Sequence, residues 1–234
     1  MKSSGCDRLF VLLLVWMIQL KFVMVVVNAR SSNYQWYADL NQMTGRASST
    51  EKSTIFLDKT KKKKKKMVNQ HHVRTLFEQY PNYLNELFFF LHVIRDKNKN
   101  DLRLGPITLL TFGKPRRRRS NWNIIQKYRN PLSRKSMTVV QIPIQGGWLS
   151  AKKTITTTQN KKNLGFLQFS CTECSKSFQM ETNIVNYLPT LARIGSSSLP
   201  IHPIGKYLYL KTQSYLHAFV MWRFHKYCHH SLLS

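Results

Sequence analysis

The chain has 234 residues and is strongly basic, with 37 Lys and Arg against 10 Asp and Glu and a formal net charge of +27. Self-repulsion of this size opposes compaction of the chain. No Asp or Glu occurs from Leu102 to Thr172 or after Glu181, so the clustered carboxylates of acid–base catalysis and of calcium or magnesium sites are missing, which argues against an enzyme.

Residues 1–29 are predicted to be a targeting segment. Leu9 to Leu20 form an apolar stretch behind a positively charged flank, and Val27-Asn28-Ala29 places small residues where a signal peptidase reads them. A signal peptide cleaved after Ala29 is the simplest interpretation, and it predicts a secreted or endomembrane protein. A signal anchor that spans Leu9 to Val27 and a helix without a targeting role are the alternatives.

Residues 30–67 are predicted to be a basic, disordered arm. The segment is rich in Ser, Thr and Lys, has no apolar period and ends in the six lysines Lys61 to Lys66. These lysines are typical of a polyanion-binding or nuclear-import patch, and also of a plain solvated charge run. Nuclear import is the alternative to secretion, because an import signal has no use in the secretory pathway.

Residues 68–150 are predicted to form a small α+β region. Apolar residues follow helical spacing on both sides of Tyr80-Pro81, which indicates two short helices with a break between them. Two later runs, Ile107 to Phe112 and Met137 to Ile144, are rich in Val, Ile and Thr and predict strands.

A basic patch lies between the two predicted strands, and it is the strongest polyanion signal in the chain. Guanidinium groups pair with phosphate or sulfate, and a neighbouring Trp can stack on a base. The candidate binding residues are Arg116, Arg117, Arg118, Arg119, Trp122, Lys127, Arg129, Arg134 and Lys135. Sulfated glycan, anionic membrane and nucleic acid are the candidate partners, and a basic loop beside a strand is the plain alternative.

Residues 151–205 are predicted to be a low-complexity segment followed by a cysteine motif. Cys171 and Cys174, with Lys176 and Phe178 behind them, resemble the first half of a Krüppel-type C2H2 zinc finger. The positions where that family carries its histidines hold Tyr187 and Leu191, so the resemblance implies a degenerate finger, a relic of a nucleic-acid-binding protein. A truncated finger and a chance match are the other interpretations.

The cysteine pair also permits a second kind of zinc site. Two thiols with two residues between them can reach one tetrahedral zinc when a tight turn separates them. The remaining ligands would come from the C-terminal segment if it folded back. The candidate set is Cys171, Cys174, His225 and Cys228, with His229 or His230 as alternatives to His225.

Residues 206–234 are predicted to form an aromatic helix. Tyr215, Phe219, Trp222 and Phe224 are almost continuous and are edged by cations. Aromatic residues beside cations are typical of a membrane interface, and a plain buried helix is the alternative.

The composition as a whole predicts no compact fold. We expect a largely irregular or disordered chain with the small α+β region, a hydrophobic N-terminal helix and the C-terminal aromatic helix. The leading functional hypothesis is non-enzymatic binding of polyanions, with zinc as the one candidate cofactor. The alternatives are the zinc-finger relic and an unselected open reading frame, which predicts no stable fold and no specific partner.

Overall fold

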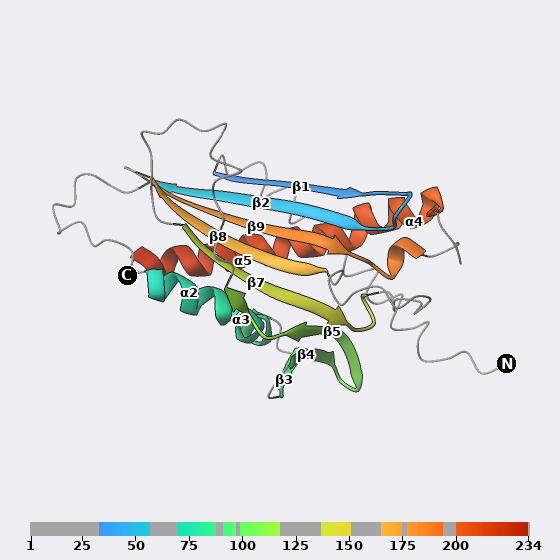
Figure 1. Cartoon of the computed structure of the whole chain (residues 1–234), viewed down its shortest axis with the longest axis horizontal. Helices are drawn as coiled ribbons and strands as arrows, with labels where there is room; N and C mark the ends of the chain where they lie inside the picture. The colour runs from blue at the N-terminus through green and yellow to red at the C-terminus, as the bar shows by residue number, and fades with distance from the viewer. Residues whose placement is uncertain are drawn as a thin grey trace.

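A computed structural model describes residues 33–56, 70–87, 91–96, 99–117, 137–150, 165–174, 177–193 and 200–233. Within these ranges the chain forms a long antiparallel sheet with helices packed on one face (Figure 1). No helix in these ranges is long and apolar enough to cross a membrane. The predicted targeting segment 1–29 and the lysines Lys61 to Lys66 lie outside the described residues.

The sheet follows one path of eight strands in the order β1-β2-β9-β8-β7-β5-β4-β3. In chain order these are β1 (Tyr34–Leu40), β2 (Ala47–Phe56), β3 (Leu91–Arg95), β4 (Lys99–Leu104), β5 (Ile107–Gly113), β7 (Met137–Gly146), β8 (Phe166–Cys174) and β9 (Ser177–Tyr187). The two-residue strand β6 (Arg116–Arg117) also pairs with β7. The strands β5 and β7 pair over a short stretch, and the register of this pairing shifts between Thr111 and Phe112.

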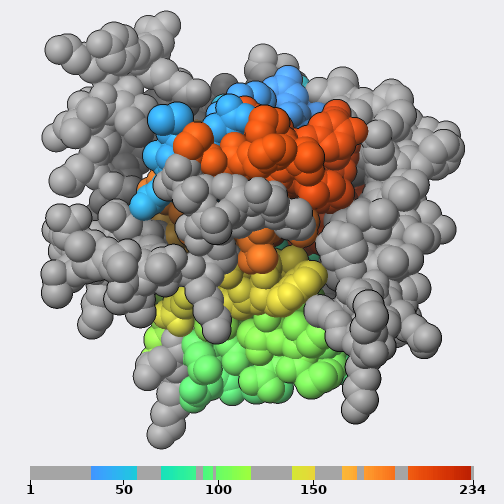
Figure 2. Space-filling model, turned by 90° about the vertical axis from the view of Figure 1, so that its right-hand side faces the viewer, coloured from blue at the N-terminus to red at the C-terminus, as the bar shows by residue number. Residues whose placement is uncertain are grey.

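The helices cover one face of this sheet. They are α2 (Gln70–Glu78), α3 (Tyr80–Leu87), α4 (Pro203–Leu208) and α5 (Ser214–Leu233), and a π-helical turn, η4 (Tyr209–Gln213), joins α4 to α5. A 3-10 turn, η3 (Leu191–Arg193), follows β9. The two short helices that the apolar spacing predicts are α2 and α3, which are separated at Gln79. Seen from the right-hand side of Figure 1, the strand order of the sheet runs from β1 and β2 (blue) at the top through β7 (yellow) to β3–β5 (green) at the bottom, with the C-terminal helical segment (orange to red) beside β1 and β2 (Figure 2).

An aromatic cluster forms the centre of the core between the sheet and the helices. Phe169 of β8 stacks on Phe77 of α2 with ring centroids 5.3 Å apart, and it meets Phe224 of α5 at the same distance. Tyr80 of α3 contacts Phe224 at 5.0 Å, and all four rings are almost fully buried. The cluster therefore joins α2, α3 and α5 to one strand of the sheet.

The prediction of a largely irregular or disordered chain is wrong for the described residues. Strands β1 and β2 lie within the predicted disordered arm, and β8 and β9 lie within the predicted low-complexity segment. The inward residues of β2 include Ser49, Glu51 and Ser53, which are buried although they are polar, so this strand lacks the apolar alternation that marks a half-buried strand.

Uneven charge is the second reason for this error. The described residues contain 14 of the 37 Lys and Arg but 8 of the 10 Asp and Glu. Self-repulsion depends on the charge of the part that compacts, and 14 basic against 8 acidic residues leave that part with only +6 of the formal charge of +27. Most of the excess positive charge lies in segments outside the described residues.

Candidate functional site

The basic patch begins on the sheet. Arg116 and Arg117 form β6 and pair with Gln141 and Val140 of β7, and the Arg116 side chain is exposed. The other members of the patch lie outside the described residues: Arg118, Arg119, Trp122, Lys127, Arg129, Arg134 and Lys135.

The strand register brings several ends of the chain together at one end of the sheet, which we call the basic end. There β2 finishes with Phe56 opposite Ser177, the first residue of β9. Ser177 also pairs with Cys174, the last residue of β8. On the other side of β8, Thr172 pairs with Met137, the first residue of β7. These strand ends meet at the left-hand end of the sheet in Figure 1.

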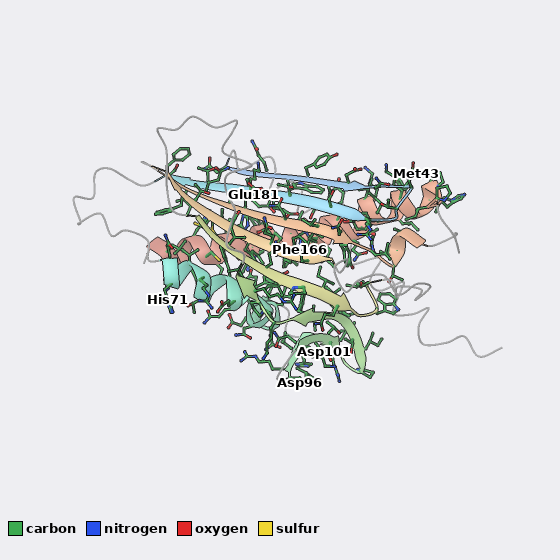
Figure 3. The ribbon with its side chains drawn as sticks, viewed as in Figure 1. Met43, His71, Asp96, Asp101, Phe166 and Glu181 are labelled. Atoms are coloured by element: carbon green, nitrogen blue, oxygen red, sulfur yellow. The ribbon has the colours of Figure 1, made fainter. Side chains whose placement is uncertain are left out.

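Two basic segments are attached at the basic end. Residues 57–69 follow Phe56 and contain seven lysines, while residues 118–136 join β6 to Met137 and contain six Lys and Arg. A third basic segment, residues 151–164 with four lysines, is attached at Ser150 and Gly165. These two residues lie at the opposite end of the sheet, the end at which Met43 is labelled in Figure 3. The first two segments are far apart in the sequence. Only the strand register shows that they are attached at the same end of the sheet.

Several acidic residues of the described chain are paired with other side chains. Lys52 binds Glu181 on the sheet, and Arg74 binds Glu78 within α2. Asp101, on β4, accepts hydrogen bonds from Thr111 and Arg103 (Figure 3). Burial alone would raise the pKa of Asp101, but these hydrogen bonds and the nearby Lys99 hold it below its ordinary value. These carboxylates are thus partly neutralised within the fold, and they oppose the positive charge of the basic end only weakly.

The cysteine motif adopts the backbone of a strand. Cys171 and Cys174 lie on the same strand, opposite Met180 and Ser177 of β9. The antiparallel partner of β8, the strand β9, begins at Ser177, so the chain has reversed direction beyond Cys174, whereas a zinc knuckle needs its tight turn between the two thiols. The Cys171 side chain is buried in the core, and the Cys174 side chain lies outside the described part.

The C-terminal helix does fold back onto the sheet, but its residues are engaged in packing and hydrogen bonds. Cys228 is fully buried, and burial together with the neighbouring Cys171 thiol raises its pKa above the ordinary range. Each nitrogen of the His225 ring lies 2.8 Å from a hydroxyl, Nδ1 from Ser53 Oγ and Nε2 from Thr182 Oγ1. Among the described side chains, no three His, Cys, Asp or Glu come close enough to hold one metal ion.

A group of polar side chains, which we call the interior polar cluster, is enclosed between the sheet and α5. Its members are Ser49, Glu51 and Ser53 of β2, Thr182 of β9, and His217, His225 and His229 of α5. The three β2 residues alternate along the strand, and His217, His225 and His229 are spaced by eight and four residues, so that each set lies on one face of its element. This double pattern is the signal that could have indicated the cluster.

The cluster contains the residue types of a Ser-His-acid relay but not its geometry. Ser49 Oγ lies 3.4 Å and Glu51 Oε1 lies 3.0 Å from the same His217 nitrogen, Nδ1. A relay needs the hydroxyl and the carboxylate on opposite ring nitrogens, so that one proton can be taken while the other is held. Glu51 Oε2 and His217 Nε2 are buried without a protein partner. The geometry therefore does not activate Ser49 as a nucleophile.

His225 and His229 are neutral at pH 7. Burial, with smaller effects from His229 and His217, lowers the pKa of His225 to about 3. Burial also lowers the pKa of His229 to about 4. The neutral rings can each donate and accept a hydrogen bond, and they tie α5 to β2 and β9.

No known protein-family model matches this chain, and no curated protein matches it significantly.

Proposed function

We propose that this protein binds polyanions without catalysis, through basic segments that its sheet holds at one end. The observation that carries the proposal is the shared attachment of residues 57–69 and 118–136 at the basic end, beside Arg116 and Arg117. Two lysine- and arginine-rich segments at one end of a rigid sheet raise the local positive potential more than the same charges spread over the molecule.

The interior of the fold supports the non-catalytic part of the proposal. The interior polar cluster lacks a relay geometry, and His225 has both nitrogens bonded to hydroxyls. The pairing of Asp101, Glu78 and Glu181 with basic residues also leaves these carboxylates poorly placed for acid–base work.

Salt-dependent binding tests the proposal. Fluorescence anisotropy of a labelled sulfated oligosaccharide and of a labelled single-stranded oligonucleotide would be measured with the full chain from 50 to 300 mM salt. A polyanion that contacts Z charged groups shows a slope of log affinity against log salt of about −0.7Z for single strands. We expect the combined substitutions Lys61→Gln, Lys62→Gln, Lys63→Gln and Lys64→Gln to weaken binding and to flatten the slope by about 2 to 3.

The opposite end of the sheet supplies a matched control with the same change in charge. Replacing its four lysines, Lys152, Lys153, Lys161 and Lys162, by Gln should change affinity and slope much less. Equal effects of the two quadruple variants would show that binding follows net charge alone, and that the basic end has no special role. The ratio of affinities for the glycan and the oligonucleotide would identify the preferred polyanion.

A further inference from the structure

The helix α5 has a buried face and an outward face of different character. Its inner face carries Met221, Phe224 and Cys228, which have no exposed surface. The outward side carries aromatic residues at helical spacing, Tyr215, Phe219 and Trp222, which are half-buried, and Phe219 packs partly against the core. An α5 whose only role was to fill the core would not need aromatic residues on both faces.

Two pairs of aromatic rings lie along this side of the helix. The rings of Phe219 and Trp222 lie 6.0 Å apart, and Trp36 at the edge strand β1 meets Tyr215 edge-on at 5.0 Å. We call Trp36, Tyr215, Phe219 and Trp222 the outer aromatic row. The preceding helix α4 adds Ile204 and Tyr207, whose exposed fractions of 56% and 62% are among the largest for apolar residues in the described chain; the region of α4 lies open in Figure 2.

The charge along this helix has a single sign. Lys211, Arg223 and Lys226 are exposed, and residues 200–233 contain no Asp or Glu. The Lys226 ammonium lies 4.1 Å from the centre of the Trp222 ring. Lys226 therefore borders the outer aromatic row directly, while Arg223 also interacts with Tyr83 of α3. The three exposed cations are complementary to an anionic partner.

This combination fits a lipid surface better than a nucleic acid. Trp and Tyr place an apolar ring and a polar tip across the boundary between acyl chains and headgroups, while Lys and Arg reach the anionic headgroups. Stacking on a base needs a free ring face, and Lys226 covers one face of Trp222. The row also lies along one helix, which is the arrangement of an interfacial helix.

We propose that the outward face of α5 docks on an anionic lipid bilayer, with the outer aromatic row at the headgroup boundary and Lys211, Arg223 and Lys226 on the headgroups. This inference rests on the proposed function, since it names an anionic membrane as one polyanion, but it is carried by a different surface. The C-terminal end of α5 lies at the basic end of the sheet (Figure 1), so one lipid surface can meet both.

Quenching of tryptophan fluorescence by brominated lipids tests the docking in the full chain. Vesicles of brominated phosphatidylcholine with 30% phosphatidylglycerol quench only rings that reach the acyl boundary. The chain has five tryptophans, so the Trp222 contribution is the difference between the wild type and Trp222→Phe. We expect Trp222→Phe to remove part of the quenched intensity, and Trp148→Phe, a matched change outside α5, to leave the quenched intensity unchanged.

The charge requirement has its own readout. The Trp222 contribution should disappear with purely zwitterionic brominated vesicles, and the pair Lys211→Gln and Lys226→Gln should weaken vesicle binding about 30-fold. Equal quenching of the wild type and Trp222→Phe on anionic vesicles would overturn the docking, whatever residues 1–29 contribute, because both chains share them. Equal Trp222 quenching on both kinds of vesicle would overturn the role of the cations.

The result also separates this inference from the proposed function. If Trp222 contributes nothing to the quenched intensity while salt-dependent glycan binding is intact, only the docking of α5 is overturned. Intact Trp222 quenching in a chain that binds neither glycan nor oligonucleotide overturns only the role of the basic end. If the oligonucleotide covers Trp222 and brominated vesicles do not quench it, the surface binds nucleic acid. That outcome refutes docking on a bilayer.

Discussion

Acidification should lower the free energy of unfolding, because it removes the stability that the neutral His225 contributes to the packing of α5. In the folded chain burial holds the pKa of this ring at about 3, against an ordinary value of 6.5. Between these two pH values the unfolded chain binds more protons than the folded chain, so the free energy of unfolding falls as the pH falls. The contribution is fully present above pH 6.5 and is lost progressively down to about pH 3.

The size of the effect follows from the width of the pH interval. One pKa unit corresponds to ~1.4 kcal/mol, so lowering the pH from 6.5 to 5 should cost about 2 kcal/mol through His225 alone. His229 titrates in the same direction, with a pKa lowered to about 4, and it adds less because its ring is partly exposed. A loss of this size is a large part of the stability of a typical domain.

Urea unfolding at pH 7, 6 and 5, followed by circular dichroism at 222 nm, measures this loss. The variant His225→Gln keeps a donor and an acceptor for Ser53 and Thr182 but does not titrate, so its stability should fall by about 2 kcal/mol less over the same range. The exposed His92→Gln is the control and should follow the wild type. Parallel pH dependences for the wild type and His225→Gln would refute the reasoning, even if the variant were less stable at every pH.

Three further results are expected. Phe224→Ala should lower the free energy of unfolding by about 3 to 5 kcal/mol, measured by urea unfolding, because the ring is fully buried in the aromatic cluster; a loss below 1 kcal/mol would contradict the cluster. Gly147→Ala should destabilise the fold by about 1 to 3 kcal/mol, since φ is +114° and a Cβ would lie 2.4 Å from the Leu109 carbonyl oxygen, whereas Gly146→Ala meets nothing within 4 Å and should cost less; equal losses would refute this packing. A chelator should leave the thermal midpoint unchanged because His225 is bonded to hydroxyls, and a fall in the midpoint would restore the zinc hypothesis.

Apolar periodicity allowed several elements to be predicted from the sequence. The helices α2 and α3 and the strands β5 and β7 present apolar residues at the spacing of their own geometry, so local pattern and tertiary environment agree. The same agreement holds for α5: its apolar residues predicted a helix, but they did not show which side of the helix would be buried. These elements needed no information from distant parts of the chain.

The strand β2 could not be predicted in this way, because the residues that justify its burial are far away in sequence. Glu51 and Ser53 face inward only because His217, His225 and His229 arrive from α5, with about 170 residues between the hydrogen-bonding partners. A Ser- and Thr-rich strand with a buried carboxylate has the composition of a loop until that helix is in place. The interior polar cluster was missed for the same reason.

The candidate binding site was only partly visible in the sequence. The two basic segments could be recognised from composition, but their shared end depends on the pairing of Phe56 with Ser177 and of Met137 with Thr172. The zinc hypothesis used the local spacing of Cys171 and Cys174 and a fold-back of the C-terminal segment; the structure shows the two cysteines on one strand, and zinc binding stays a prediction for the chelator experiment. Spacing identifies residue types, while register decides which of them meet.

The short pairing between β5 and β7 predicts that the sheet opens in two steps. Two residue pairs join β5 to β7, Thr111 with Gly146 and Phe112 with Ile144. Two further backbone hydrogen bonds, from Trp148 to Thr108 and from Leu149 to Leu109, hold β5 just beyond the end of β7. This connection is still much shorter than the nine-pair register that joins β8 to β9. In native-state hydrogen exchange the amides of β4 should exchange through a partial opening, at a lower free energy than those of β8. A force across the sheet would separate β5 from β7 first. The helix α5, which carries the proposed membrane face, would stay packed on the part of the sheet formed by β1, β2, β7, β8 and β9.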